Sequence, residues 1–161
     1  MISTDLLIAL IDFIDLSHLD LTRSICECLY YLSMDSNLQR FISHHGQEKL
    51  RHLLGQTDDP SIFCSIVHIL TEFIQKNQSI ANDLIVNMMS LLRRSSNAAD
   101  FLRIIKSLDQ LTQLPQTVTL FRLENLYPDL LSYSRTEKNT EIQATLLSIL
   151  EQCAKDKQSA E

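Results

Sequence analysis

Glycine is scarce in this chain, because Gly46 and Gly55 are the only two among 161 residues. Two isolated glycines cannot form a GxGxxG turn or a P-loop, so the commonest nucleotide-binding loops are excluded. Valine is scarce as well, with 3 residues against 28 leucines and 16 isoleucines. Because sheet proteins favour valine and threonine and need glycine at their turns, the composition predicts an all-helical fold.

Positive charge is also limited. Lysine and arginine together number 14 against 20 acidic residues, which gives a net charge of -6 and a calculated pI near 5.3. Affinity for a phosphate backbone comes from clustered cations. The one adjacent basic pair, Arg93-Arg94, is interpreted as the solvated end of a helix. We therefore expect no nucleic-acid partner.

Long apolar runs are missing too. No apolar run reaches the length of a membrane-spanning helix, about 20 residues, so no membrane span is expected. Asp5 interrupts the start and no basic segment precedes it, so no signal peptide is expected. The cysteines lie in apolar helical stretches, where we interpret them as small buried hydrophobes. They are Cys26, Cys28, Cys64 and Cys153. These features favour a reducing cytoplasmic or nuclear location.

Apolar periodicity and capping signals predict a series of helices. The first covers 3–16, with its apolar stripe at Leu6, Leu7, Leu10, Phe13 and Ile14. Further helices are predicted at about 21–34, 36–44, 47–54, 60–76, 79–94, 98–113, 116–124, 126–134 and 139–155. Gly46 and Gly55 are expected to end the two short helices. Asp59-Pro60 is a typical helix start. Residues 156–161 are predicted to form a frayed polar tail.

The longer helices contain an internal repeat. Six apolar positions of one helix recur as apolar residues about 40 residues later, and again after about two further periods. The three sets are Leu21, Ile25, Cys26, Cys28, Leu29 and Leu32; Ile62, Ile66, Val67, Ile69, Leu70 and Phe73; and Ile142, Leu146, Leu147, Ile149, Leu150 and Cys153. A degenerate copy between them has Ile104, Ile105, Leu108 and Leu111, with polar Asp100 and Ser107. A period of about 40 residues predicts a helical solenoid whose units stack.

The units share a second feature, a helix that ends in paired leucines: Leu53-Leu54, Leu91-Leu92 and Leu130-Leu131. The segment SICECLYYLSMDSNLQRFISHHGQEKLRHLLGQTDDP resembles an armadillo repeat, with a long apolar helix, an Asn-containing break, a short helix, a glycine turn and a Leu-Leu helix. The second and third units lack that glycine, so the resemblance implies that their two short helices merge or bend there, as in the related two-helix HEAT repeats. The resemblance implies a right-handed α-solenoid of about 3.5 units that acts as a protein-interaction scaffold. It divides one domain, 1–155, into an N-terminal helix at 3–16 and units at about 20–58, 59–97, 98–137 and 138–155.

The resemblance also indicates where a partner would bind. In armadillo folds the long third helix lines a concave groove, and peptide-binding members carry Asn and Trp there. The equivalent pairs here are Tyr31 with Glu27, Glu72 with His68, Gln110 with Lys106, and Gln152 with Ser148. Neither Asn nor Trp is present, so binding of nuclear signals is not carried over. Tyr30 and Tyr31 are the best aromatic anchor, and Glu27 and Glu72 favour a basic segment. The alternative is a solvated helix face with Tyr30 partly in the core.

The N-terminal helix suggests a second function. Its Leu10, Phe13 and Ile14 lie one repeat period before Leu50, Leu53 and Leu54, so it corresponds to the last helix of a unit. Its off-stripe residues Ile2, Ile8 and Ile11 make an apolar outer face that favours contact with a partner, a second copy or more of the same chain. The alternative function is therefore a terminal or internal section of a larger helical-repeat assembly or co-chaperone protein.

Enzyme and metal signals are weak. His44, His45 and His52 fall on two predicted helices with no cysteine nearby, so we interpret them as surface histidines. Cys26 and Cys28 point about 200° apart on a helix and cannot chelate together. No GxSxG motif is present, and the acidic residues are spread over helix faces rather than paired in a cleft. We expect a non-enzymatic protein without a cofactor or metal. A small helical enzyme or ligand-binding bundle would need a closed polar cavity.

Overall fold

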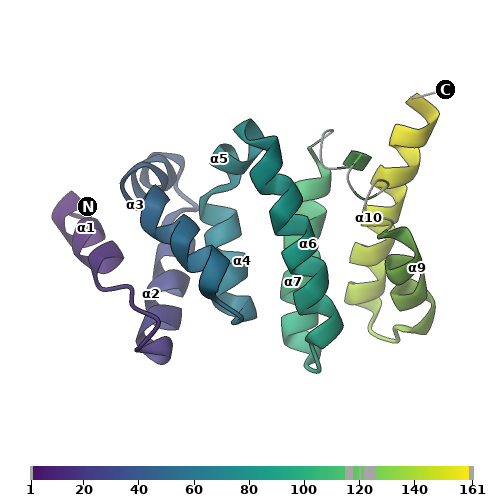
Figure 1. The fold of residues 1–161 in the computed structure, drawn as a ribbon, viewed down its shortest axis with the longest axis horizontal. Coiled ribbons are helices and arrows are strands. Elements are labelled where there is room, and N and C mark those ends of the chain that lie inside the picture. Colours follow the sequence, from purple (N-terminus) through teal and green to yellow (C-terminus); the bar gives the residue numbers. More distant parts are fainter. Residues whose placement is uncertain (1, 115–117, 120, 122–125, 160–161) are drawn as a thin grey trace. The chain divides into compact units, whose positions relative to one another are not determined.

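The computed structural model describes residues 2–114, 118–119, 121 and 126–159, and these are largely helical (Figure 1). No strand occurs in this part of the chain. The predicted all-helical class is therefore confirmed. The chain divides into two compact units, Met1–Phe73 and Ile74–Glu161, which we call unit 1 and unit 2 and describe separately.

Unit 1 is built from four helices and the start of a fifth. They are α1 (Thr4–Asp12), α2 (Leu19–Leu32), α3 (Ser36–Gln56), α4 (Pro60–Ile69) and α5 (Thr71–Lys76). Helix α2 packs against α4, and α3 packs against both α1 and α4. Side chains at helical spacing fill the space between them, and several are fully buried: Leu7, Cys26, Leu29, Ile42, Leu50, Ile62 and Ile66.

Capping residues fix where these helices begin. The Ser3 side chain accepts a hydrogen bond from the amide of Asp5 at 3.2 Å, and α1 begins at the next residue, Thr4. Asp59 caps α4 by accepting from the amide of Ile62 at 3.1 Å, and Pro60 follows in the first turn. Because each cap satisfies an amide that has no partner inside the helix, these short polar residues set the element boundaries.

Gly46 does not end a helix, contrary to the prediction from the sequence. The segments predicted at 36–44 and 47–54 form the single helix α3. An ideal Cβ at Gly46 would lie 3.1 Å from Cδ1 of Leu50 and 3.4 Å from Cδ1 of Ile11. The missing side chain therefore allows α1 to approach α3 closely. The helix predicted over 60–76 is also different, because it is broken at Leu70 into α4 and α5.

The first helix is shorter than predicted and buries a different face. It covers Thr4–Asp12 rather than 3–16. Its buried residues are Leu7 and Ile11, and Ile14 just beyond its end is buried too. Leu6 and Phe13, assigned to the core stripe from the sequence, are 53% and 66% exposed. Ile11, assigned to the outer face, is in fact packed against α3. Apolar residues surround most of this helix, so periodicity alone could not select the buried side.

Unit 2 contains α6 (Gln78–Arg94), α7 (Ala98–Thr112), α9 (Tyr127–Thr136) and α10 (Thr140–Ser159). Helix α7 packs against α6 and α10, and α9 packs against α10. The helix predicted at 116–124 falls mostly outside the described residues, although Val118 and Phe121 are described and buried. The backbone of α10 stays helical beyond the predicted end at 155.

Candidate protein-binding face

Three of the predicted binding residues meet on neighbouring helices of unit 1. The ring of Tyr30 on α2 lies 4.7 Å from the ring of His68 on α4, with an interplanar angle of 62°. Tyr30 also contacts Tyr31, with centroids 5.3 Å apart and an angle of 72°. Both contacts are edge-to-face, the arrangement that aromatic quadrupoles favour. We call Tyr30, Tyr31 and His68 the tyrosine cluster.

Burial differs across the tyrosine cluster. Tyr31 is 68% exposed, whereas Tyr30 and His68 are half-buried. The backbone carbonyl of His68 accepts hydrogen bonds from Nε2 of Gln39 at 3.3 Å and from Oγ1 of Thr71 at 2.8 Å. These contacts hold the carboxyl end of α4 against α3, so His68 provides a fixed wall for Tyr30. Tyr31 is left as an aromatic ring that projects from an ordered base.

An ion pair ties the other ends of α2 and α4 together. Nη2 of Arg23 lies 2.6 Å from Oδ2 of Asp59, and Nε of Arg23 donates to the same oxygen at 3.0 Å. Partial burial of Asp59 raises its pKa, but the hydrogen bond from Arg23 and the amide of Ile62 outweigh this effect, so the pKa lies below its usual value. The charged carboxylate is thus favoured, and it fixes α4 relative to α2.

The predicted acidic residues flank this cluster in the sequence. Glu27 lies one helical turn before Tyr31 on α2 and is half-buried. Glu72 lies four residues after His68, beyond the break at Leu70 and in the first turn of α5, and is exposed. Carboxylates close in sequence to the exposed ring of Tyr31 and the half-buried ring of His68 suit a ligand that carries both a cation and an apolar stem.

The predicted binding residues of unit 2 have partly different roles. Nζ of Lys106 on α7 lies 2.7 Å from Oε1 of Glu141 on α10. Oγ of Ser148 on α10 donates to Oδ1 of Asp109 on α7 at 2.9 Å. Lys106 and Ser148 therefore connect two helices. Of the other two predicted residues, Gln110 is exposed and Gln152 is half-buried.

The histidines and cysteines form no metal centre in the described part of the chain, where no group of three suitable ligands occurs. His44, His45 and His52 all lie on α3, since the predicted break at Gly46 is absent. The cysteine interpretation is correct for Cys26 and Cys153, which are buried, and wrong for Cys28, which is exposed.

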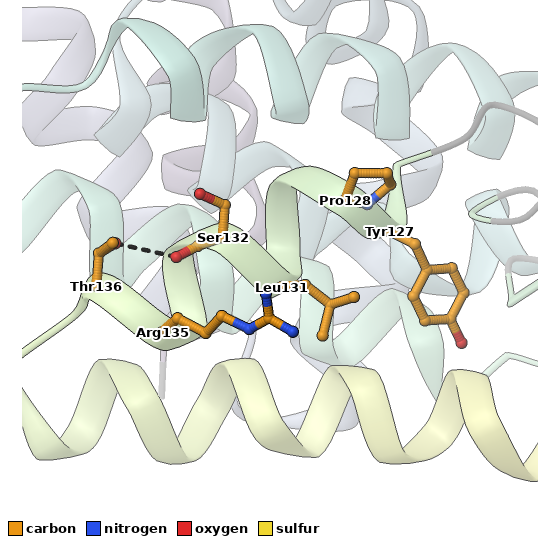
Figure 2. Close-up of a pocket in the computed structure, with 6 residues that line it drawn as sticks. All are labelled: Tyr127, Pro128, Leu131, Ser132, Arg135 and Thr136. Atoms are coloured by element: carbon orange, nitrogen blue, oxygen red, sulfur yellow. Dashed lines mark hydrogen bonds between the residues drawn. The ribbon is translucent and has the colours of Figure 1, made fainter.

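Sequence reasoning missed a surface hollow on α9, shown in Figure 2. Its volume is about 440 Å³, and its lining consists of Tyr127, Pro128, Leu131, Ser132, Arg135 and Thr136. We call this feature the α9 hollow. Leu131 is the second leucine of a Leu-Leu pair, yet it is 39% exposed, whereas Leu54 and Leu92 at the same repeat position are buried. The departure of Leu131 from this pattern is visible only once burial is known.

Among the described residues, no helix combines the length and apolar character that a membrane crossing requires. Comparisons with protein-family models, with curated proteins and with solved structures found no significant match.

Proposed function

We propose that this protein is a non-enzymatic protein-interaction module whose tyrosine cluster binds a basic segment of a partner protein. The observation that carries the proposal is the exposed ring of Tyr31 beside the fixed rings of Tyr30 and His68. Tyrosine offers a large rigid contact area at low entropic cost and is enriched at the centres of interfaces. Glu27 and Glu72 supply the charge that selects a basic ligand.

We further propose that the helices form armadillo-like repeats of a right-handed solenoid. Packing within each unit supports this. In unit 1, α1 packs on α3 and α2 packs on α4, and each pair consists of helices that correspond in the sequence repeat. In unit 2, the corresponding helices α7 and α10 pack together in the same way. Contacts between equivalent helices are how repeat proteins bury their apolar faces.

Binding can be tested with fluorescein-labelled peptides of equal length that are rich in lysine and arginine, rich in glutamate, or neutral. Fluorescence anisotropy should show preference for the basic peptides. The double variant Glu27→Lys/Glu72→Lys should weaken that binding about tenfold or more, since like charges then face each other. Tyr31→Ala should weaken the binding of every peptide that the unmodified protein binds, because it removes the aromatic anchor.

A matched control separates local recognition from total charge. Glu48→Lys/Asp83→Lys changes the net charge by the same amount at two exposed positions outside the tyrosine cluster. This control should bind basic peptides within about twofold of the unmodified protein at moderate salt, because exposed charges that do not contact the ligand are largely screened. Equal losses in both double variants, or no preference for basic peptides, would refute the proposed face.

A second candidate function is a structural section of a larger helical-repeat assembly. The exposed apolar side chains of Leu6 in α1 and of Phe13 at its C-cap favour it, because soluble proteins rarely leave a contiguous apolar stripe uncovered.

A further inference from the structure

Helix α1 carries a second apolar stripe besides the one that packs on α3. Leu6, Leu10 and the C-cap residue Phe13 follow one another about one helical turn apart, which places them along one side of the helix, and Ile2 lies just before its N-cap Ser3. Leu6 and Phe13 are more than half exposed, Ile2 is exposed, and Leu10 is partly covered. We call these four residues the α1 stripe.

The α1 stripe has a buried counterpart within the same unit. A shift of one repeat period matches its members to Ile42, Gly46, Leu50 and Leu53 of α3, and all four are buried. That side of α3 is where α1 packs. Cδ1 of Ile11 lies 3.4 Å from an ideal Cβ at Gly46, and Nζ of Lys49 donates to the carbonyl oxygen of Asp12 at 2.7 Å. The α1 stripe thus repeats a surface that accepts a neighbouring helix.

The α9 hollow corresponds, in the sequence repeat, to the α1 side of the contact between α1 and α3. Ile11 of α1 packs against Gly46 of α3, and Ile14, just after the end of α1, is buried as well. When the pair Phe13-Ile14 is aligned with the pair Leu130-Leu131, Ile14 corresponds to Leu131. The same alignment makes Ile11 correspond to Pro128. Both Pro128 and Leu131 line the α9 hollow and are exposed (Figure 2).

We propose that a second copy of this chain covers the α1 stripe, by packing the α9 hollow of one molecule on α1 of the next. The contact would reproduce the packing of α1 on α3, with Pro128 and Leu131 in the places of Ile11 and Ile14. Because the two surfaces differ, the interface is heterologous, and it generates either a closed ring or an open chain of molecules. This inference rests on the repeat correspondence proposed above and is independent of peptide binding by the tyrosine cluster.

Charge supports this occupant over pairing of two α1 stripes. Arg135 lies two turns after Pro128, so in the proposed register it reaches the carboxyl end of the next molecule's α1, where Asp12 and Asp15 are exposed. Helix α1 contains Asp5 and Asp12 and no lysine or arginine. An antiparallel pair of α1 stripes would bring like carboxylates to the same edge, which is unfavourable.

The test is sedimentation velocity of the 161-residue chain over a wide concentration range. The unmodified protein should form species larger than a dimer at high concentration. A stripe variant, Leu6→Ser/Phe13→Ser, and a hollow variant, Leu131→Asp/Arg135→Glu, should each remain monomeric. Circular dichroism checks that both remain folded, which is expected because the replaced residues are exposed.

Mixing the two variants provides the sharpest result. The hollow variant retains an intact α1 stripe and the stripe variant retains an intact α9 hollow, so the mixture should form a one-to-one dimer that grows no further. The control Val86→Ser/Leu147→Ser removes two other exposed apolar side chains and should assemble like the unmodified protein.

Three outcomes would overturn the proposal. They are an unmodified protein that stays monomeric at every concentration, a hollow variant that dimerises alone through its α1 stripe, and a mixture that stays monomeric. The charge-reversal variant Glu27→Lys/Glu72→Lys should assemble normally, and the stripe variant should bind peptides normally. Failure of assembly and failure of peptide binding are therefore distinguishable.

Discussion

Replacing Asp59 should destabilise unit 1 measurably, because this residue has two roles at the start of α4. Its carboxylate caps the helix through the amide of Ile62 and pairs with Arg23 of α2, and its side chain is only 11% exposed. An N-cap contributes about 1 kcal/mol. The ion pair should contribute about 1 kcal/mol, the upper end for pairs with one exposed partner. Asp59→Ala should therefore cost about 2 kcal/mol.

Asp59→Asn separates the two roles, because asparagine caps helices well but carries no charge. It should cost about half as much as Asp59→Ala. The assay is urea unfolding followed by circular dichroism, with a double-mutant cycle that adds Arg23→Gln. A coupling free energy near zero, or equal effects of Asp59→Ala and Asp59→Asn, would refute this division. The more exposed pair Arg93–Asp129 in unit 2 should show weaker coupling in the same cycle.

The effect of Asp59 should also depend on pH. Burial raises its pKa in the folded protein, but the hydrogen bond from Arg23 and the helix amides outweigh burial and bring the pKa below the usual value of 3.8. A lowered folded pKa gives a stabilisation that is fully present above the unfolded pKa and is lost as the pH falls through the folded one. The difference in unfolding free energy between the unmodified protein and Asp59→Asn should thus be constant near neutral pH and shrink below about pH 4.

Three further predictions concern packing, reactivity and surface charge. Gly46→Leu should cost about 2 kcal/mol in urea unfolding by forcing α1 from α3, whereas Gly55→Ala, with nothing within 4 Å of the added carbon, should be neutral. Iodoacetamide should modify exposed Cys28 well before Cys26, whose pKa burial raises to about 12; similar rates by peptide mass mapping would contradict this burial. Lys106→Ala should cost at most about 0.5 kcal/mol despite losing its ion pair, and a larger loss in urea unfolding would show that the exposed pair is structurally important.

The all-helical fold class and several helix starts could be predicted from the sequence, because local signals determine them. Asp59-Pro60 combines a side-chain acceptor with a residue whose missing amide proton is not needed there, and α4 begins at that site. The sequence repeat aligns α2 with α4 and therefore assigned Tyr31 and His68 to the same predicted face. The contact between the rings of Tyr30 and His68 was not predicted and is known only from the structure.

Features that depend on neighbouring helices could not be predicted in the same way. Glycine is common just past the end of a helix, so Gly46 was expected to end one. In the structure α3 continues through Gly46, against which Ile11 packs. In α1, both Ile11 and Leu6 belong to plausible apolar stripes, and contact with α3 decides that Ile11 is buried. The exposure of Leu131 likewise follows from what packs beside α9 rather than from the leucine pair itself.

Head-to-tail assembly would change how the tyrosine cluster binds its ligand, because each added molecule contributes another tyrosine cluster to the same oligomer. A ligand with two basic segments could then bind two clusters, and effective concentration can raise overall affinity by about 10²–10⁴. At concentrations where the protein assembles, a peptide with two basic segments should therefore bind much more tightly than a single one. The stripe variant Leu6→Ser/Phe13→Ser should bind both peptides alike. If that variant kept the full advantage of the double peptide, the gain would arise within one molecule and assembly would have no part in it.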